Sequence, residues 1–208
     1  DADERDDAVS VMSAPVDVTM EVDNPAHVYG RGLAPMFFSI ALWVFGISAF
    51  FLLRPITGRM LAARGSDLRI AVTAWATLAA TSVVASWIML AVAWVGLGLD
   101  PAHPWLIIML TTLVALAFSA VAHLMRTWLG LVATAAMLVL LIIQLTAAGG
   151  TYPPELLPPV FASLGHFMPM RYSIEAFRIA ISGGLMSRFW FDVTLLALLL
   201  VSAIALLL

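Results

Sequence analysis

The sequence lacks two residue types on which many functional sites depend. None of its 208 residues is cysteine, which excludes disulfide bonds, thiolate nucleophiles and zinc–thiolate sites within this chain. It also lacks lysine, since all 10 basic residues are arginine. A phosphate-binding P-loop needs a lysine that reaches the β- and γ-phosphates of ATP. The chain therefore does not bind and hydrolyse ATP in the manner of P-loop ATPases.

Charge of either sign is also scarce. Charged residues make up 11% of the sequence and hydrophobic residues 62%, with a mean hydropathy of +1.02, whereas soluble domains are about 45–50% apolar. This composition predicts an all-α polytopic membrane protein. The formal net charge is −3, but most of the acids fall within residues 1–23 and the remainder is slightly basic. Nothing in this pattern is typical of a nucleic-acid partner.

Five apolar segments predict transmembrane helices, because each has about the 20 residues that a helix needs to cross the hydrocarbon core. They cover residues 34–53, 70–97, 105–125, 128–148 and 189–208. The loop after the first segment is rich in arginine, which predicts a cytoplasmic position. Its basic residues are Arg54, Arg59, Arg64 and Arg69. Two interpretations of these arginines stay open: contact with anionic lipids, or docking of an ATPase partner.

The first 33 residues differ from the rest of the chain. Residues 1–13 are acidic, and apolar residues then alternate with polar ones over 16–22, a period of two that predicts a half-buried β-strand. We interpret 1–33 as a juxtamembrane segment at the end of an extracellular domain, with a disordered linker as the alternative. The arginine-rich loop then predicts an extracellular N-terminal end, a cytoplasmic C-terminus and an earlier transmembrane helix that precedes this sequence.

The long break between the last two spans, residues 149–184, predicts a pair of short helices. Prolines suit the first turn of the first helix, and Met168-Pro169 precedes the second. In the second helix Ile174, Phe177 and Ile181 form an apolar stripe, and Gly183-Gly184 ends it. Neither helix is long enough to cross a bilayer, so we expect an extracellular re-entrant hairpin.

These motifs resemble a known family. The matching stretches are Val28 to Phe37, Gly149-Gly150-Thr151-Tyr152-Pro153, Met168-Pro169-Met170 and Ile181-Ser182-Gly183-Gly184. Together they resemble the C-terminal membrane domain of the YhgE/Pip family, the bacterial "phage infection protein" homologues related to type-2 ABC exporters. The resemblance implies a six-helix permease-like half, with five helices in this sequence, that pairs with a second copy in the bacterial plasma membrane.

Polar residues within the spans are candidates for a substrate path. The second span carries a stripe of hydroxyl groups at Thr73, Thr77, Thr81 and Ser82, and the fourth span carries Gln144 in an apolar run. Ordinary helix packing explains each of them as well, because hydroxyl and amide groups bond across helix interfaces.

The hairpin carries the other candidates. Arg171, Glu175 and Arg178 share one helix face, which could meet water or receive anionic headgroups. The remaining hairpin candidates are Tyr152, Pro153, Glu155 and Tyr172. No catalytic constellation, metal-ligand cluster or cofactor motif occurs, so we do not expect an enzyme.

These observations lead to two hypotheses about function. The first is a homodimeric inner-membrane permease-like subunit that exports or transports an amphipathic or envelope-directed substrate, in contact with membrane lipids and with a separate ATPase or secretion-system subunits. The second is a non-transporting scaffold or receptor, such as a phage receptor or a secretion-system component, that acts through its extracellular domain.

Overall fold

A computed structural model describes residues 29–52, 67–148 and 159–207 of the chain. Several predictions concern residues outside these ranges. They are the strand at 16–22, the loop residues Arg54, Arg59 and Arg64, and the hairpin residues Tyr152, Pro153 and Glu155.

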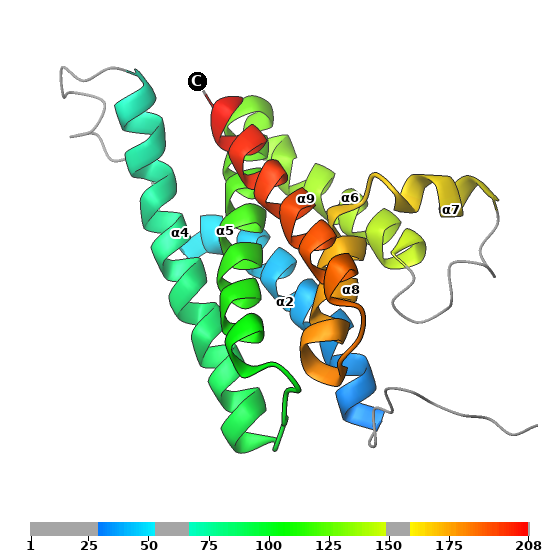
Figure 1. Ribbon diagram of the computed structural model, residues 1–208. Helices are drawn as coiled ribbons and strands as arrows, with labels where there is room; N and C mark the ends of the chain where they lie inside the picture. The colour runs from blue at the N-terminus through cyan, green and yellow to red at the C-terminus, as the bar shows by residue number, and fades with distance from the viewer. Residues whose placement is uncertain (1–28, 53–66, 149–158, 208) are drawn as a thin grey trace, which may run out of the picture.

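The described residues form a bundle of helices without β-strands, which confirms the all-α class (Figure 1). The long helices are α2 (Tyr29–Leu52), α4 (Asp67–Ala91), α5 (Pro104–Leu129) and α9 (Met186–Ala205), and α6 (Ala133–Ala147) has 15 residues. Two shorter helices, α7 (Pro159–Gly165) and α8 (Pro169–Ser182), lie between α6 and α9 in the chain. Helix α4 continues as a π-helical turn, η1 (Val92–Gly96), and a 3-10 turn, η2 (Gly130–Val132), joins α5 to α6.

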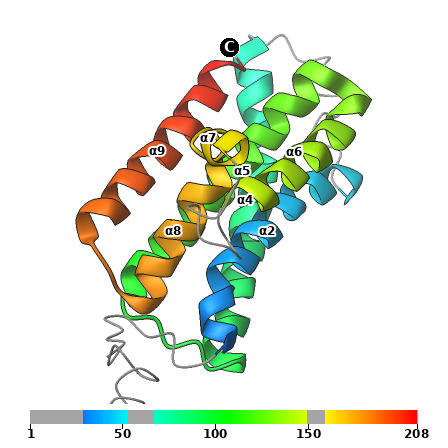
Figure 2. The same cartoon turned by 90° about the vertical axis from the view of Figure 1, so that its right-hand side faces the viewer.

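Four segments of the described chain are long and apolar enough to cross a bilayer: Gly30–Ala49, Val72–Gly96, Pro104–Ala147 and Met186–Ala205. The third combines α5, η2 and α6. Its chain reverses direction at η2, where Gly130 has a positive φ of 58°, so α5 and α6 run side by side in opposite directions (Figures 1 and 2). Among the described connections, the tight turn is the one at η2 between α5 and α6.

Helix α5 forms the centre of the bundle and packs against α2, α4, α6, α8 and α9. Small residues make close approach possible: a Cβ on Gly46 of α2 would lie 3.3 Å from the Cβ of Ala122. Aromatic side chains fill the remaining core. Trp43 packs edge-on against Phe118 with ring centroids 5.1 Å apart, and Phe38 meets Phe177 of α8 in the same way. These ring contacts join α2 to α5 and to α8.

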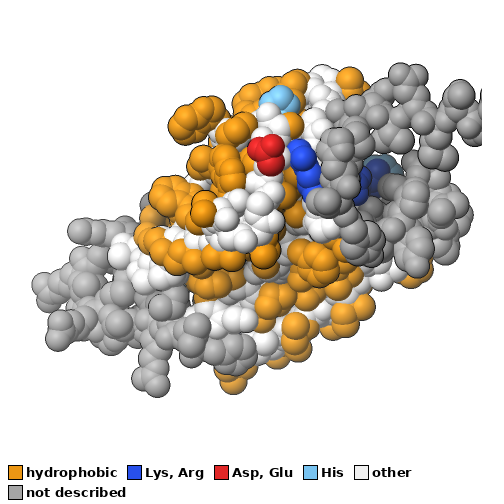
Figure 3. Space-filling model, turned by 90° about the horizontal axis from the view of Figure 1, so that it is seen from below, with side chains coloured by type: hydrophobic (Ala, Val, Ile, Leu, Met, Phe, Trp, Pro, Cys, Tyr) orange, Lys and Arg blue, Asp and Glu red, His pale blue; other side chains and the backbone are white. Residues whose placement is uncertain are grey.

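Large apolar side chains also cover much of the outer surface. Val95, Trp105 and Leu131 are more than 80% exposed. Seen from the end where α4 passes into the turn before α5, hydrophobic side chains dominate and charged ones are few (Figure 3). A bilayer is the solvent that suits such a surface, because hydrocarbon does not penalise exposed apolar groups.

Candidate functional site

Helix α8 is the element around which the polar contacts of the bundle gather. It has 14 residues, about 21 Å of helix, which is too short to cross a hydrocarbon core about 30 Å thick. Pro169 occupies its first turn, and Gly183, with a positive φ of 91°, ends it by donating its N–H to the carbonyl of Ile179. The apolar stripe predicted at Ile174, Phe177 and Ile181 is completely or almost completely buried.

The first turn of α8 is satisfied by a side chain of another helix. The N–H of Met170 donates to Oε1 of Gln144 on α6 at 3.1 Å, and both residues are fully buried. A first-turn N–H has no carbonyl partner within its own helix, and leaving it unpaired in an apolar interior is costly. One turn further on, the Ser173 hydroxyl lies 2.8 Å from the Ser39 hydroxyl of α2 and 2.9 Å from the carbonyl of Met170. Gln144 and Ser39 therefore fix the position of α8.

The last turn of α8 is satisfied in a similar way. The carbonyl of Ile181 accepts hydrogen bonds from Nη2 of Arg31 on α2 at 2.7 Å and from the N–H of Ala102 at 2.9 Å. The carbonyl of Ala180 accepts from the N–H of His103 at 3.0 Å. Two of the carbonyls that a helix leaves free at its C-terminus are thus paired with α2 and with the loop before α5. Both ends of this short helix are bonded to its neighbours.

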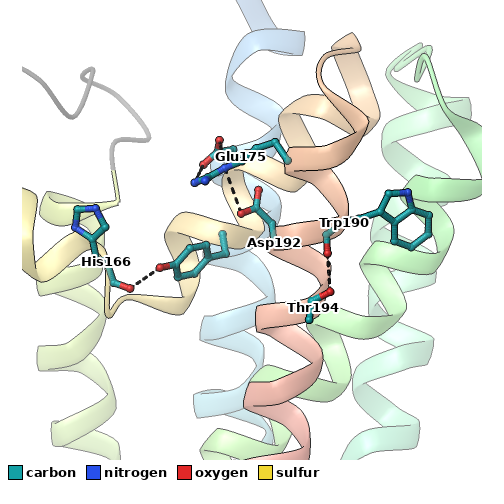
Figure 4. Close-up of polar contacts among 7 residues, drawn as sticks. His166, Glu175, Trp190, Asp192 and Thr194 are labelled. Carbon is teal, nitrogen blue, oxygen red and sulfur yellow. Dashed lines mark hydrogen bonds and ion pairs between the residues drawn. The ribbon is translucent and has the colours of Figure 1, made fainter.

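A cluster of charged side chains joins α8 to α9 (Figure 4). Arg188 of α9 donates two hydrogen bonds to Glu175 of α8, from Nε to Oε1 at 2.8 Å and from Nη2 to Oε2 at 3.0 Å. Its Nε also lies 3.6 Å from Oδ1 of Asp192, one turn along α9. The guanidinium carbon is 5.1 Å from the centroid of the Phe191 ring, which adds a cation–π contact. We call Glu175, Arg188 and Asp192 the α8–α9 charge cluster.

The two acids of this cluster differ in their surroundings. Side-chain exposure is 30% for Glu175, which accepts both hydrogen bonds from the guanidinium. Asp192 is 0% exposed, and neither of its carboxylate oxygens accepts a hydrogen bond. Burying a carboxylate without donors is unfavourable unless a nearby positive charge compensates it. Arg188, whose Nε lies 3.6 Å from Oδ1, offsets only part of this cost, because burial and the neighbouring negative charge of Glu175 both disfavour the charged carboxylate.

Comparison with known proteins identifies the family. The sequence profile described as "ABC-2 type transporter" matches residues 16–182. The chain belongs to this family. It is also 29% identical over 190 residues to the protein named "Uncharacterized protein YhgE" of Bacillus subtilis (strain 168). The matched region is 90% of this chain but 24% of that relative, so the chain spans about a quarter of its length. No solved structure matches.

These matches confirm the predicted resemblance to the YhgE/Pip family and to type-2 ABC exporters. They also make this ABC-2 chain a permease-like part of a multi-pass membrane protein. The profile match includes all of α8 and ends at Ser182. Arg188 and Asp192, the members of the charge cluster on α9, lie outside the matched region.

The predicted substrate-path residues occupy two separate places in this ABC-2 fold. Thr73 and Thr77 lie on the exposed side of α4. Thr81 is half-buried and its hydroxyl donates to backbone carbonyls of its own helix, while Ser82 is buried. Gln144 lies on α6, on the other side of α5 and α2 in Figure 1, where it binds α8. A common path for these residues stays a prediction.

The charged residues predicted for the hairpin have different environments. Arg178 is exposed and Arg171 is half-buried. Glu175 lies between them in sequence and pairs with Arg188 of the next helix. The Tyr172 hydroxyl donates to the carbonyl of His166, which ties α8 to the segment after α7. The last residue predicted for lipid or partner contact, Arg69, belongs to the first turns of α4.

Neither Arg188 nor Asp192 was predicted as a site residue. A signal was present, because an arginine and an aspartate four residues apart lie on the same face of a helix and Asp192 falls inside an apolar span. Within the parts of the chain that the structure describes, no three His, Cys, Asp or Glu side chains come together in a way that could hold a metal ion. The polar chemistry there is that of ion pairing and hydrogen bonding between helices.

Proposed function

We propose that this chain is the membrane part of a bacterial permease-like subunit that exports an amphipathic or envelope-directed substrate as a homodimer. The observation that carries the proposal is α8: a helix too short to span, enclosed by long apolar helices, and bonded at both ends to α2, α6 and the loop before α5. Non-spanning helices at membrane depth occur where protein or a polar cavity surrounds them, as in transporters.

One surface of α4 supports pairing with a second copy. Thr73, Ala76, Thr77 and Ala80 are exposed on this chain. Small and hydroxyl-bearing residues allow two helices to approach closely in a membrane. The hydroxyls of Thr77 and Thr81 bond to carbonyls of their own helix, so they need no hydrogen-bond partner from the second copy. In a dimer with this seam, the α4 hydroxyls face the position that the substrate path would occupy.

The absence of cysteine from this chain gives a direct test of the seam. The full-length protein, with any cysteines outside this region replaced, would carry Thr77→Cys on α4 or Val139→Cys on α6, two exposed positions on different helices. Oxidative cross-linking in native membranes should give a covalent dimer with Thr77→Cys and little with Val139→Cys. Cross-linking only through Val139→Cys would contradict the α4 seam.

The shape of the seam separates transport from the alternative role. Electron cryomicroscopy of the full-length protein in lipid nanodiscs should reveal a polar cavity between two copies that opens beside the α4 contact at Thr77. A dry and fully packed seam in every particle class would overturn the permease proposal. It would favour the alternative, a non-transporting scaffold or receptor that acts through an extracellular domain.

A further inference from the structure

A cleft opens at the end of the bundle where α2 begins and η1 ends. Its volume is about 480 Å³, within the range of about 300–1,000 Å³ that is usual for small-molecule sites. Its walls are mostly apolar and include Phe37, Phe38, Leu97 and Leu99. Among the residues that the structure describes, Arg31 is the one charged residue that lines it. An apolar cleft with a single cationic group suits a ligand that has an apolar body and an anionic end.

The guanidinium of Arg31 is held in place but lacks an anionic partner among the described residues. Its Nη2 donates to the carbonyl of Ile181, whereas its Nε is buried and bonds to nothing. The two ion pairs present in the described structure involve Arg188 instead. Asp100, close by in the loop after η1, is exposed and makes no ion pair with Arg31. A guanidinium held at the wall of a cleft is suited to phosphate or carboxylate oxygens, because its planar terminal donors match their geometry.

The position of the cleft indicates the source of the ligand. The apolar segments Gly30–Ala49 and Val72–Gly96 respectively begin and end at the cleft, so its mouth lies at the membrane boundary. Phospholipid phosphates lie at this depth, with acyl chains extending toward the bilayer centre. Val95 and Leu97 beside the cleft are at least 80% exposed, which makes its approach apolar as well.

We propose that this cleft binds one anionic phospholipid, with the phosphate on Arg31 and an acyl chain along Phe37, Phe38 and Leu97. Because Arg31 also bonds the last turn of α8, a lipid bound here contacts the same side chain that holds that helix end. The proposal does not depend on transport. Its failure would leave the α4 cross-linking result unchanged, so the two proposals fail independently.

Photolabelling of the full-length protein in phosphatidylcholine nanodiscs tests the site. The probe is a trace of phosphatidylglycerol with a photoreactive acyl chain, and the readout is labelling of the peptides that contain residues 30–38 and 93–99. Arg31→Gln removes the charge and should lower this labelling about tenfold, the effect of losing roughly 1.4 kcal/mol of binding free energy. The same photoreactive chain on phosphatidylcholine should label these peptides only weakly in the wild type.

A second variant keeps Arg31 and fills the space instead. A Cβ on Gly30 would meet no atom within 4 Å, and Gly30 lines the cleft, so Gly30→Phe should occlude it without straining the backbone. Ala41→Phe, an exposed position of the same helix, is the matched control for bulk, and Arg178→Gln is the control for charge. Both controls should label as the wild type does.

Four results would overturn the proposal. The first is unchanged labelling in both Arg31→Gln and Gly30→Phe, and the second is equal labelling by the phosphatidylcholine probe. The third is complete protection by millimolar inorganic phosphate, which would identify a site for free anions rather than for a lipid. A loss seen in Arg31→Gln but not in Gly30→Phe would also count against it, because Arg31→Gln additionally removes the bond to Ile181.

Discussion

Helices α4 and α8 contain similar polar residues but satisfy them in opposite ways. In α4 the hydroxyls of Thr77, Thr81 and Ser86 donate to carbonyls of their own helix, three or four residues earlier. In α8 the polar groups bond to other helices: Ser173 contacts Ser39, and Glu175 contacts Arg188. Helix α4 makes few polar contacts with its neighbours, one of them from Nε1 of Trp87 to the hydroxyl of Thr112 on α5 at 2.9 Å, whereas α8 depends on several such contacts.

Length accounts for the difference. Helix α4 with η1 extends over the 25-residue segment Val72–Gly96, enough to cross the bilayer with its ends near water. Helix α8 has 14 residues and is enclosed by the bundle, so its terminal backbone groups need partners from the protein. The same substitution should therefore cost more in α8 and its contacts than in α4. Four pairs of variants test how strongly α8 depends on its neighbours, in the full-length protein reconstituted in nanodiscs, from the largest expected effect to the smallest; the first and last pairs include a position in η1 or α4.

The largest effect is expected at Gly165, the last residue of α7, in the stretch that leads to α8. A Cβ on Gly165 would lie 2.5 Å from the carbonyl oxygen of Ala147, so Gly165→Ala forces the backbone of α6 or α7 to move. We expect a loss of about 2–3 kcal/mol in unfolding free energy, measured by thermal unfolding. Gly96→Ala, at the end of η1, places its Cβ 3.8 Å from Cγ1 of Val92 and should be nearly neutral. Equal effects would contradict the comparison.

The next effect concerns the first turn of α8. Gln144→Leu leaves the buried N–H of Met170 without an acceptor and should cost about 2 kcal/mol. Amide hydrogen exchange should accelerate at the start of α8. Thr146→Val on the same helix removes a hydroxyl that bonds only to the carbonyl of Ile142, and exchange in α8 should then stay unchanged. Unchanged exchange in Gln144→Leu would mean that another group holds this end of α8.

The charge cluster gives a comparison between two acids. Glu175→Gln weakens both hydrogen bonds to Arg188 and should lower the unfolding free energy by about 1.5 kcal/mol. The loss is limited because water screens a pair that is partly exposed. Asp192→Asn should cost less than about 0.5 kcal/mol, because that carboxylate accepts no hydrogen bond and its burial is unfavourable. Thermal unfolding of both variants measures the difference. A larger loss in Asp192→Asn would identify Asp192 as the main ionic partner of Arg188.

The smallest effect separates two fully buried serines. Ser173→Ala removes the bond between α8 and α2 and should cost about 1 kcal/mol. Ser86→Ala removes a bond within α4, to the carbonyl of Val83, and should be close to neutral. Thermal unfolding of each variant provides the measurement. The comparison between local and tertiary bonding would fail for hydroxyl groups if Ser86→Ala were the more damaging change.

Periodicity and composition predicted several parts of the candidate site. They placed a short helix after Met168-Pro169, ended it at Gly183-Gly184 and assigned Ile174, Phe177 and Ile181 to its apolar side. They also placed Glu175 on a polar face, because residues three or four apart share a face of a helix. The partner of Glu175 was not predicted, because Arg188 lies on another helix and its orientation depends on how α9 packs.

The sequence alone determined that this is an all-α membrane protein and that α8 is too short to cross a bilayer. Those properties depend on hydrophobicity and on spacing within about 20 neighbouring residues. Tertiary structure decided that Gln144 bonds Met170, that Arg31 bonds the end of α8 while lining a cleft, and that Asp192 is buried. Arg31 and Ile181 are 150 residues apart, and no local pattern encodes a contact that forms only when separate helices pack together.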